Sequence, residues 1–104
     1  MKRILLICIF LVLGCNVQRV PPGEEVQQEL SEDAVKGQMI FMEYCNKCHP
    51  AGSSGLGPSI INKPLPGFLI KLQVRTGMGV MPSFKKEQLS EKELDDIVEY
   101  IKAI

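Results

Sequence analysis

Residues 44–50 read YCNKCHP, and this stretch decides how the rest of the chain is interpreted. His49 is the single histidine among 104 residues, and it directly follows the Cys-x-x-Cys pair of Cys45 and Cys48. Two thiols and an imidazole in this order suit a zinc site, a redox-active dithiol or the attachment site of a prosthetic group. The segments on either side of the motif have to discriminate among the three.

The first residues of the chain are typical of an export signal. Basic residues at positions 2 and 3 precede an apolar run over residues 4–13, which is short for a bilayer-spanning helix and suits a secretory signal. The run ends in Val-Leu-Gly followed by Cys15, an arrangement that resembles the box of bacterial lipoproteins. The resemblance implies that residues 1–14 are removed as a signal peptide and that Cys15 is lipidated. An ordinary signal peptide or an uncleaved anchor is the alternative.

Removal of that signal changes the charge and the thiol content of the chain. The twelve basic residues include Lys2 and Arg3, whose loss leaves ten basic residues against twelve acidic ones. Of the four cysteines, Cys8 lies in the signal and Cys15 carries the lipid, so only the motif pair remains in the folded body. Two thiols so close together cannot staple a small domain, which usually needs a metal or a cofactor instead. The pair is therefore expected to carry out chemistry.

The folded body is predicted as one domain over residues 31–104. Residues 15–30 contain Pro-Pro-Gly and few large apolar groups, so they are predicted to form the lipidated N-terminus and a flexible tether. Ser31, followed by two acidic residues, is predicted to cap a helix that leads to Cys45. The residues expected on one face of this helix are Gly37, Ile40, Phe41 and Tyr44, and the two methionines expected in its core are Met39 and Met42.

The segments after the motif carry loop and helix signals. Residues 50–67 hold eight of the chain's sixteen glycines and prolines and are predicted to be loop. Over residues 68–76, apolar residues alternate with polar ones, which slightly favours a strand, although a short helix also fits. Ser90 and Glu93 form a capping-box pattern ahead of an amphipathic helix. The apolar positions of that helix are Leu94, Ile97, Val98 and Ile101.

The surroundings of the motif favour one of its three interpretations. A structural zinc site takes four protein ligands, whereas the motif supplies three at most and the chain has no second Cys or His pair. A thioredoxin-like pair belongs at the start of a helix, whereas this pair follows a predicted helix and precedes a loop. Cys-x-x-Cys-His fits the attachment of haem c, because two thioethers hold the porphyrin edge while the next imidazole lies beneath the iron. An exported chain also suits this attachment, which takes place outside the cytoplasm.

From about Ala34 to its C-terminus, the chain resembles the class I c-type cytochromes. The resemblance is carried by the helix leading into residues 45–49, by residues 55–58 (GLGP), by residues 75–82 (RTGMGVMP) and by the capped terminal helix with Tyr100. It implies an all-α fold, a small cytochrome c-like domain of three to four helices wrapped around one covalently bound haem c. It also implies that the first and last helices cross near Gly37 and Tyr100. Residues 68–76 would then be helical, against the slight preference of their periodicity.

The resemblance assigns the iron and thioether bonds to individual residues. It implies thioethers from Cys45 and Cys48, with His49 as the proximal iron ligand. Met81 matches the Met-Pro position of the sixth ligand in that family, and Met78 in the same glycine-rich stretch is the alternative.

Two further residues are implied as partners of the bound group. Pro58 matches the position whose carbonyl oxygen accepts a hydrogen bond from the proximal histidine, which would fix the tautomer of His49. Arg75 is a candidate contact to a haem propionate, and a solvated arginine at a helix end is the alternative.

Histidine and methionine ligation leaves the iron no open position for a substrate, and methionine raises the reduction potential. The chain is therefore expected to be an electron carrier and not an enzyme. The first hypothesis is a membrane-tethered mono-haem cytochrome c that passes single electrons between respiratory or periplasmic redox partners. The alternatives are a haem c subunit of a larger oxidoreductase, such as a terminal oxidase or a dehydrogenase, and a haem sensor or peroxidase-like enzyme. The expected location is the periplasmic or outer-surface side of a bacterial membrane.

Charge is distributed unevenly along the chain. Between Tyr44 and Lys86 there is no Asp or Glu, whereas acids crowd residues 24–33 and 87–99. The basic residues of this stretch are Lys47, Lys63, Lys71, Arg75, Lys85 and Lys86. They are expected to surround the haem and to steer a redox protein with an acidic docking face, and solvated loop charges without a docking role are the alternative. No nucleic acid is expected as a partner.

Overall fold

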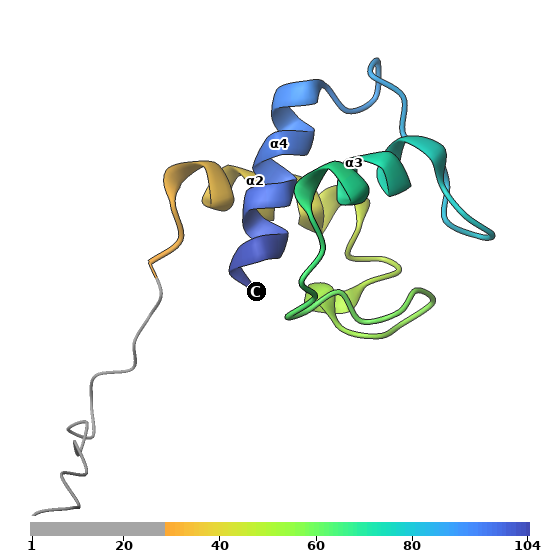
Figure 1. Ribbon diagram of the computed structural model, residues 1–104, viewed down its shortest axis with the longest axis horizontal. Helices are drawn as coiled ribbons and strands as arrows, with labels where there is room; N and C mark the ends of the chain where they lie inside the picture. Colours follow the sequence, from red (N-terminus) through yellow and green to blue (C-terminus); the bar gives the residue numbers. More distant parts are fainter. Residues whose placement is uncertain (1–28) are drawn as a thin grey trace, which may run out of the picture.

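The computed structural model describes residues 29–104. In chain order its elements are α2 (Glu32–Tyr44), the short 3-10 helix η1 (Pro50–Gly52), α3 (Gly67–Thr76) and α4 (Glu91–Ala103). Within residues 29–104 the only β interaction is an isolated bridge between Met78 and Met81, so the all-α prediction is confirmed (Figure 1). The predicted signal peptide, Cys15 and nearly all of the predicted tether lie outside the described residues.

Helix α2 begins where the sequence predicts. Ser31 is its N-cap, because the Ser31 hydroxyl accepts a hydrogen bond from the Ala34 amide at 3.1 Å. The helix buries Ala34, Gly37 and Phe41, which are three and four residues apart and form one narrow stripe. This stripe faces the interior and determines which other side chains of α2 are left outside.

The expectation that Met39 and Met42 are core residues is wrong. Their side chains are 63% and 49% exposed. The physical reason is the angular position of the buried stripe: Gly37 and Phe41 define the inward face, and residues two and five positions after Gly37 point elsewhere.

Helix α4 carries the predicted capping box. The Ser90 hydroxyl accepts a hydrogen bond from the Glu93 amide at 3.3 Å, and the Glu93 carboxylate accepts one from the Ser90 amide at 2.8 Å. The buried apolar side chains of the helix are Leu94, Ile97, Val98 and Tyr100. Three of the four predicted apolar positions are therefore confirmed as buried, and the fourth, Ile101, is partly buried against the core.

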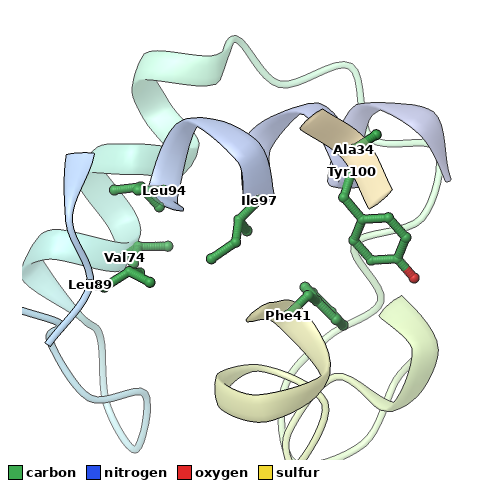
Figure 2. Packing of buried hydrophobic residues seen from close by; sticks show 7 residues of the cluster. All are labelled: Ala34, Phe41, Val74, Leu89, Leu94, Ile97 and Tyr100. Carbon is green, nitrogen blue, oxygen red and sulfur yellow. The ribbon is translucent and has the colours of Figure 1, made fainter. Parts of the chain in front are cut away.

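Helices α2 and α4 cross in close contact at Gly37. A β-carbon added to Gly37 would lie 1.8 Å from the carbonyl oxygen of Asp96, so only glycine permits this approach. One turn further along α2, the rings of Phe41 and Tyr100 meet edge to face with their centroids 5.2 Å apart. The predicted crossing near Gly37 and Tyr100 is confirmed. In Figure 2 these two rings lie at one end of the core, and Val74, Leu89 and Leu94 lie at the other end.

Helix α3 confirms the helix that the family resemblance implied, and the strand preferred by periodicity is wrong. Its buried residues, Ile70 and Val74, are four positions apart, whereas Leu72 between them is 55% exposed. The apolar residues at 70, 72 and 74 suggest a strand, but only the first and last of them are buried, and these two are spaced by four residues as on one face of a helix. An ion pair between Lys71 and Asp95 joins α3 to α4.

Two long connecting segments provide the rest of the described chain. Figure 1 shows residues 45–66 and residues 77–90 extending to the same side of the α2–α4 pair. The predicted loop over residues 50–67 contains only the single turn of η1 before α3 begins at Gly67. No helix within residues 29–104 combines the length and the apolar character needed to cross a membrane.

Candidate functional site

The Cys-x-x-Cys-His motif continues directly from the last turn of α2. The amide of Cys45 donates to the Phe41 carbonyl at 2.8 Å, and the amides of Cys48 and His49 donate to the Cys45 carbonyl at 3.1 and 2.9 Å. The chain therefore keeps turning after the helix ends, so the three side chains of the motif stay close together. Cys45 and Cys48 are both partly buried and both carry free thiols.

The motif and Met81 line the same pocket, although they are more than thirty residues apart in the sequence. The pocket has a volume of about 280 Å³ and a largely apolar lining. Cys45, Cys48, His49 and Met81 all contribute to it. Its other lining residues are Glu43, Tyr44, Lys47, Pro82 and Phe84. The structure thus brings together the four residues that the sequence predicts to hold the haem.

The imidazole of His49 is held by the loop that follows the motif. Its Nδ1 lies 2.8 Å from the carbonyl oxygen of Pro58, as the resemblance implied. Because a carbonyl can only accept, Nδ1 carries the proton and Nε2 keeps a free lone pair. Gly57 lets the loop lie against the ring, because a β-carbon there would come within 2.3 Å of Cε1 of His49. The Gly57 amide also donates to the Cys48 carbonyl at 2.9 Å, which ties the loop back to the motif.

Met81 reaches the pocket from the segment between α3 and α4. Its backbone pairs with that of Met78, and its thioether sulfur lies 3.6 Å from Nε2 of Gln73, which donates to it. Met78 itself is 72% exposed and is absent from the pocket lining, so the geometry favours Met81 over Met78 as the ligand. Gln73 was missed in the sequence. Its only signal is an amide between two apolar residues of α3, and many solvated glutamines share it.

The Cys45 thiol is unlike that of a redox-active dithiol. Burial, with a contribution from the neighbouring Cys48, raises the pKa of Cys45 to about 11. Reactive dithiols lower the pKa of their attacking thiol, so this pair does not have the electrostatics of that class. Within the part of the chain that the structure describes, no three His, Cys, Asp or Glu side chains are arranged to hold a metal ion together.

Arg75, in the last turn of α3, lies outside the pocket lining, and its side chain reaches both α4 and the segment that joins the two helices. Its Nη1 donates to the carbonyl oxygens of Phe84 and Leu89 at 3.2 and 2.7 Å. Its Nη2 donates to the carboxylate of Glu91 at 3.0 Å. Its Nε is buried and has no hydrogen-bond partner among residues 29–104.

The contacts of Arg75 change the pKa of the Glu91 carboxyl group. Burial opposes its ionisation, but the hydrogen bond and the charge of Arg75, with a further contribution from Lys86, outweigh burial and hold the pKa of Glu91 below its ordinary value. The carboxylate therefore stays ionised beside the guanidinium at neutral pH.

The groups of the pocket fit haem c. Two thiols lie beside an imidazole whose Nε2 is free, and a thioether sulfur comes from a separate segment. The apolar lining suits a porphyrin face, and His with Met is an established axial pair for haem iron.

Comparisons with known proteins identify the family of the chain. The sequence model of the family described as "Cytochrome C oxidase, cbb3-type, subunit III" matches residues 32–101, which include every residue of the pocket. Cytochrome c6 of Cyanidioschyzon merolae is 29% identical over 86 residues, which cover 75% of this chain and 81% of the relative. The 4-cresol dehydrogenase [hydroxylating] cytochrome c subunit of Pseudomonas putida is 29% identical over 68 residues, which cover 65% of this chain and 59% of the relative. No solved structure matches the chain.

Proposed function

Because the chain belongs to the cytochrome c family of cbb3-type oxidase subunit III, we propose that it passes single electrons between redox proteins while tethered to a membrane. Members of this family bind covalent haem c and carry electrons, and the chain is likewise a haem c electron carrier and not an enzyme in itself.

One observation carries the assignment of residues: Cys45, Cys48, His49 and Met81 line a single pocket. We assign the two thioethers to the cysteines, the proximal ligand to Nε2 of His49 and the sixth ligand to the sulfur of Met81. The Pro58 carbonyl keeps the His49 ring in one tautomer and one orientation, and Gln73 orients the Met81 sulfur. Bound haem supplies a one-electron couple, and ligands on both faces leave no iron position for a substrate.

The test of attachment is extraction with acidified acetone, which removes haem that is held only by iron ligation. The denatured wild-type polypeptide is expected to retain its haem, because the two thioether bonds survive loss of the fold. A Cys45→Ala/Cys48→Ala double variant is expected to release whatever haem it has bound. Absorption of the precipitated polypeptide in the visible region measures the result. Free release from the wild-type protein would contradict the attachment.

For the Arg75 side chain we propose a contact with a haem propionate through Nε. The support is that this buried donor has no partner among the described residues, while the other two guanidinium nitrogens are engaged. A guanidinium donor beside a carboxylate would form a charge-assisted hydrogen bond.

A permanent place in a larger oxidoreductase is the second candidate function. The observation that favours it is the Pseudomonas putida relative, which is named as a subunit of a dehydrogenase. Gentle isolation of the native protein distinguishes the two candidates, since a shuttle travels alone and a subunit co-purifies with its enzyme.

The proposed anchor is a lipid on Cys15, which would place the domain on the periplasmic or outer-surface side of a bacterial membrane. The support is the sequence alone, in the apolar run that ends at Gly14-Cys15. A tether over residues 15–30 would let the folded domain move about the anchor, at a reach of roughly 20–25 Å for a flexible chain of this length.

The basic residues of the site region are not all available for docking. Three of them form ion pairs: Lys71 with Asp95, and Arg75 and Lys86 with Glu91. The three that form no ion pair with another described residue are Lys47, Lys63 and Lys85. Lys47 also lines the pocket. We propose that these lysines steer a redox partner with an acidic docking face.

Electron transfer to the natural partner should therefore slow as salt rises, because exposed charges are screened beyond a Debye length of about 8 Å at physiological ionic strength. A Lys63→Glu/Lys85→Glu variant, which leaves the pocket-lining Lys47 in place, is expected to lower the bimolecular rate about tenfold at low salt and to leave the reduction potential nearly unchanged. Stopped-flow mixing with the purified partner measures the rate. Lys102→Glu, on the last turn of α4, is the control and should keep the wild-type rate. If the bimolecular rate changes neither with salt nor with the double charge reversal, the lysines do not steer the partner.

A further inference from the structure

Met81 lies on a segment that has little regular structure of its own. Residues 77–90 connect α3 to α4, and the backbone takes positive φ values at Gly77 (69°) and Gly79 (57°). The backbones of Met78 and Met81 exchange hydrogen bonds of 3.2 and 2.9 Å, which close the tip of the segment on itself. This pairing fixes the shape of the tip but not its position. The position depends on the contacts between residues 77–90 and the helices.

Arg75, in the last turn of α3, makes two of those contacts and a third bond to the first turn of α4. Its guanidinium donates to the carbonyl oxygens of Phe84 and Leu89 and to the carboxylate of Glu91, at 3.2, 2.7 and 3.0 Å. One side chain thus joins the end of α3, two points of the connecting segment and the first turn of α4. The side chain is only 18% exposed, so water has little access to replace these bonds.

The contacts of Arg75 act where the segment meets the site. The Phe84 amide donates to the Val74 carbonyl at 2.9 Å, and the Phe84 carbonyl accepts from Arg75, so both backbone polar groups of Phe84 are bonded to α3. Its ring packs edge to face on Tyr44, with the centroids 5.9 Å apart, and it lines the same pocket as Met81. Phe84 follows Met81 by only three residues. A displacement of Phe84 would therefore move Met81 relative to the other residues that line the pocket, His49 among them.

We propose that Arg75 is a positioning residue for the Met81 ligand, which it holds over the haem pocket by fixing residues 84–91 to the end of α3. The inference rests on the proposed function, because it takes Met81 as the sixth ligand. An external ligand can bind the iron only when Met81 is away, so its apparent affinity is set by the fraction of molecules in the open form. Arg75 keeps that fraction small.

The test is imidazole binding to the oxidised, haem-loaded protein. Arg75→Gln removes the guanidinium that makes all three hydrogen bonds, and the apparent affinity for imidazole is expected to rise by at least about tenfold, the factor for losing a single charged hydrogen bond. Arg75→Lys keeps the charge but loses the planar fork, so it should fall between Arg75→Gln and wild type. The methionine–iron charge-transfer band of the oxidised protein should weaken in the same order.

Lys71→Gln is the matched control. Lys71 also joins α3 to an acidic residue of α4, Asp95, but it makes no hydrogen bond or ion pair with residues 77–90. This variant should bind imidazole as wild type does. If Arg75→Gln binds imidazole no more tightly than Lys71→Gln, the inference is overturned. Should Arg75→Gln fail to accumulate, Glu91→Gln removes the negative charge of the carboxylate that Arg75 donates to and should still raise the affinity about threefold; no rise would overturn the inference as well.

Failure of the proposed function gives a different result. Met81→Ala should lose the charge-transfer band whatever Arg75 does, and a surviving band would remove Met81 as the ligand. A lost band in Met81→Ala together with unchanged imidazole binding in Arg75→Gln would overturn only the positioning role of Arg75.

Discussion

Replacing Met81 with Ala is expected to abolish the methionine–iron charge-transfer band and to open the iron to carbon monoxide. The sulfur of Met81 is the only thioether among the described residues that line the pocket, so its removal would leave bound haem iron without a sixth ligand from this lining. The reduction potential should fall by on the order of 0.1 V, within the roughly 0.8 V over which axial ligands move haem potentials. Visible spectroscopy, carbon monoxide titration of the reduced protein and potentiometry measure the three effects.

Met78→Ala is the matched control, because it removes a second methionine three residues away on the same tip. The Met78 side chain is 72% exposed and does not line the pocket, so all three readouts should stay near their wild-type values. The opposite pattern, with loss of the band in Met78→Ala and its survival in Met81→Ala, would move the ligand to Met78.

Replacing Gly37 with Ala is expected to destabilise the fold by about 3 kcal/mol, the upper end of the usual cost of overpacking. The new β-carbon would lie 1.8 Å from the Asp96 carbonyl oxygen and 2.8 Å from the Ile97 amide nitrogen, so the backbones of α2 and α4 would have to separate. For a domain of this size the melting temperature should fall by more than about 10 °C. Thermal unfolding of the haem-loaded protein, followed by far-ultraviolet circular dichroism, measures the shift.

Two alanine variants control for helix propensity and for added volume. Gln38→Ala changes the exposed neighbour of Gly37 and should be neutral or slightly stabilising. Gly67→Ala adds the same methyl group where the nearest atom is a side-chain carbon of Val98 at 3.1 Å, which can adjust. A Gly37→Ala protein that melts with these controls would show that α2 and α4 do not meet as described.

The features that the sequence predicted well are those in which neighbouring residues act on one another. Ser31 caps the helix that it precedes, and Ser90 pairs with Glu93 three residues later. The Cys-x-x-Cys-His motif likewise places its chemistry within five consecutive residues. Such features depend on local backbone geometry, so a reader of the sequence can find them without knowing the fold.

The features that the sequence did not predict depend on contacts between distant segments. Met39 and Met42 are apolar and are therefore expected in the core from the sequence alone. Only the approach of α4 to Gly37 shows that they lie on the outer side of α2. Two of the three acceptors of Arg75 are backbone carbonyls, which every residue possesses, so no side-chain pattern identifies them. The helix over residues 68–76 could be predicted only from the family resemblance. A ten-residue helix with two buried positions is too short for the helical period to stand out from a strand-like alternation of apolar residues.

The pairing of α2 with α4 also has a consequence for how the length of this chain can change. The first and last described helices hold each other directly, so everything between them is in effect one large closed loop. The closing entropy of a loop grows only with the logarithm of its length, at about 0.6 kcal/mol for each doubling. Residues 62–66 are exposed throughout and lie after the loop that holds His49 and before α3 begins. Insertions of several residues between Lys63 and Leu65 should therefore cost little, and this is the place where a recognition element for a particular partner could be added without disturbing the haem.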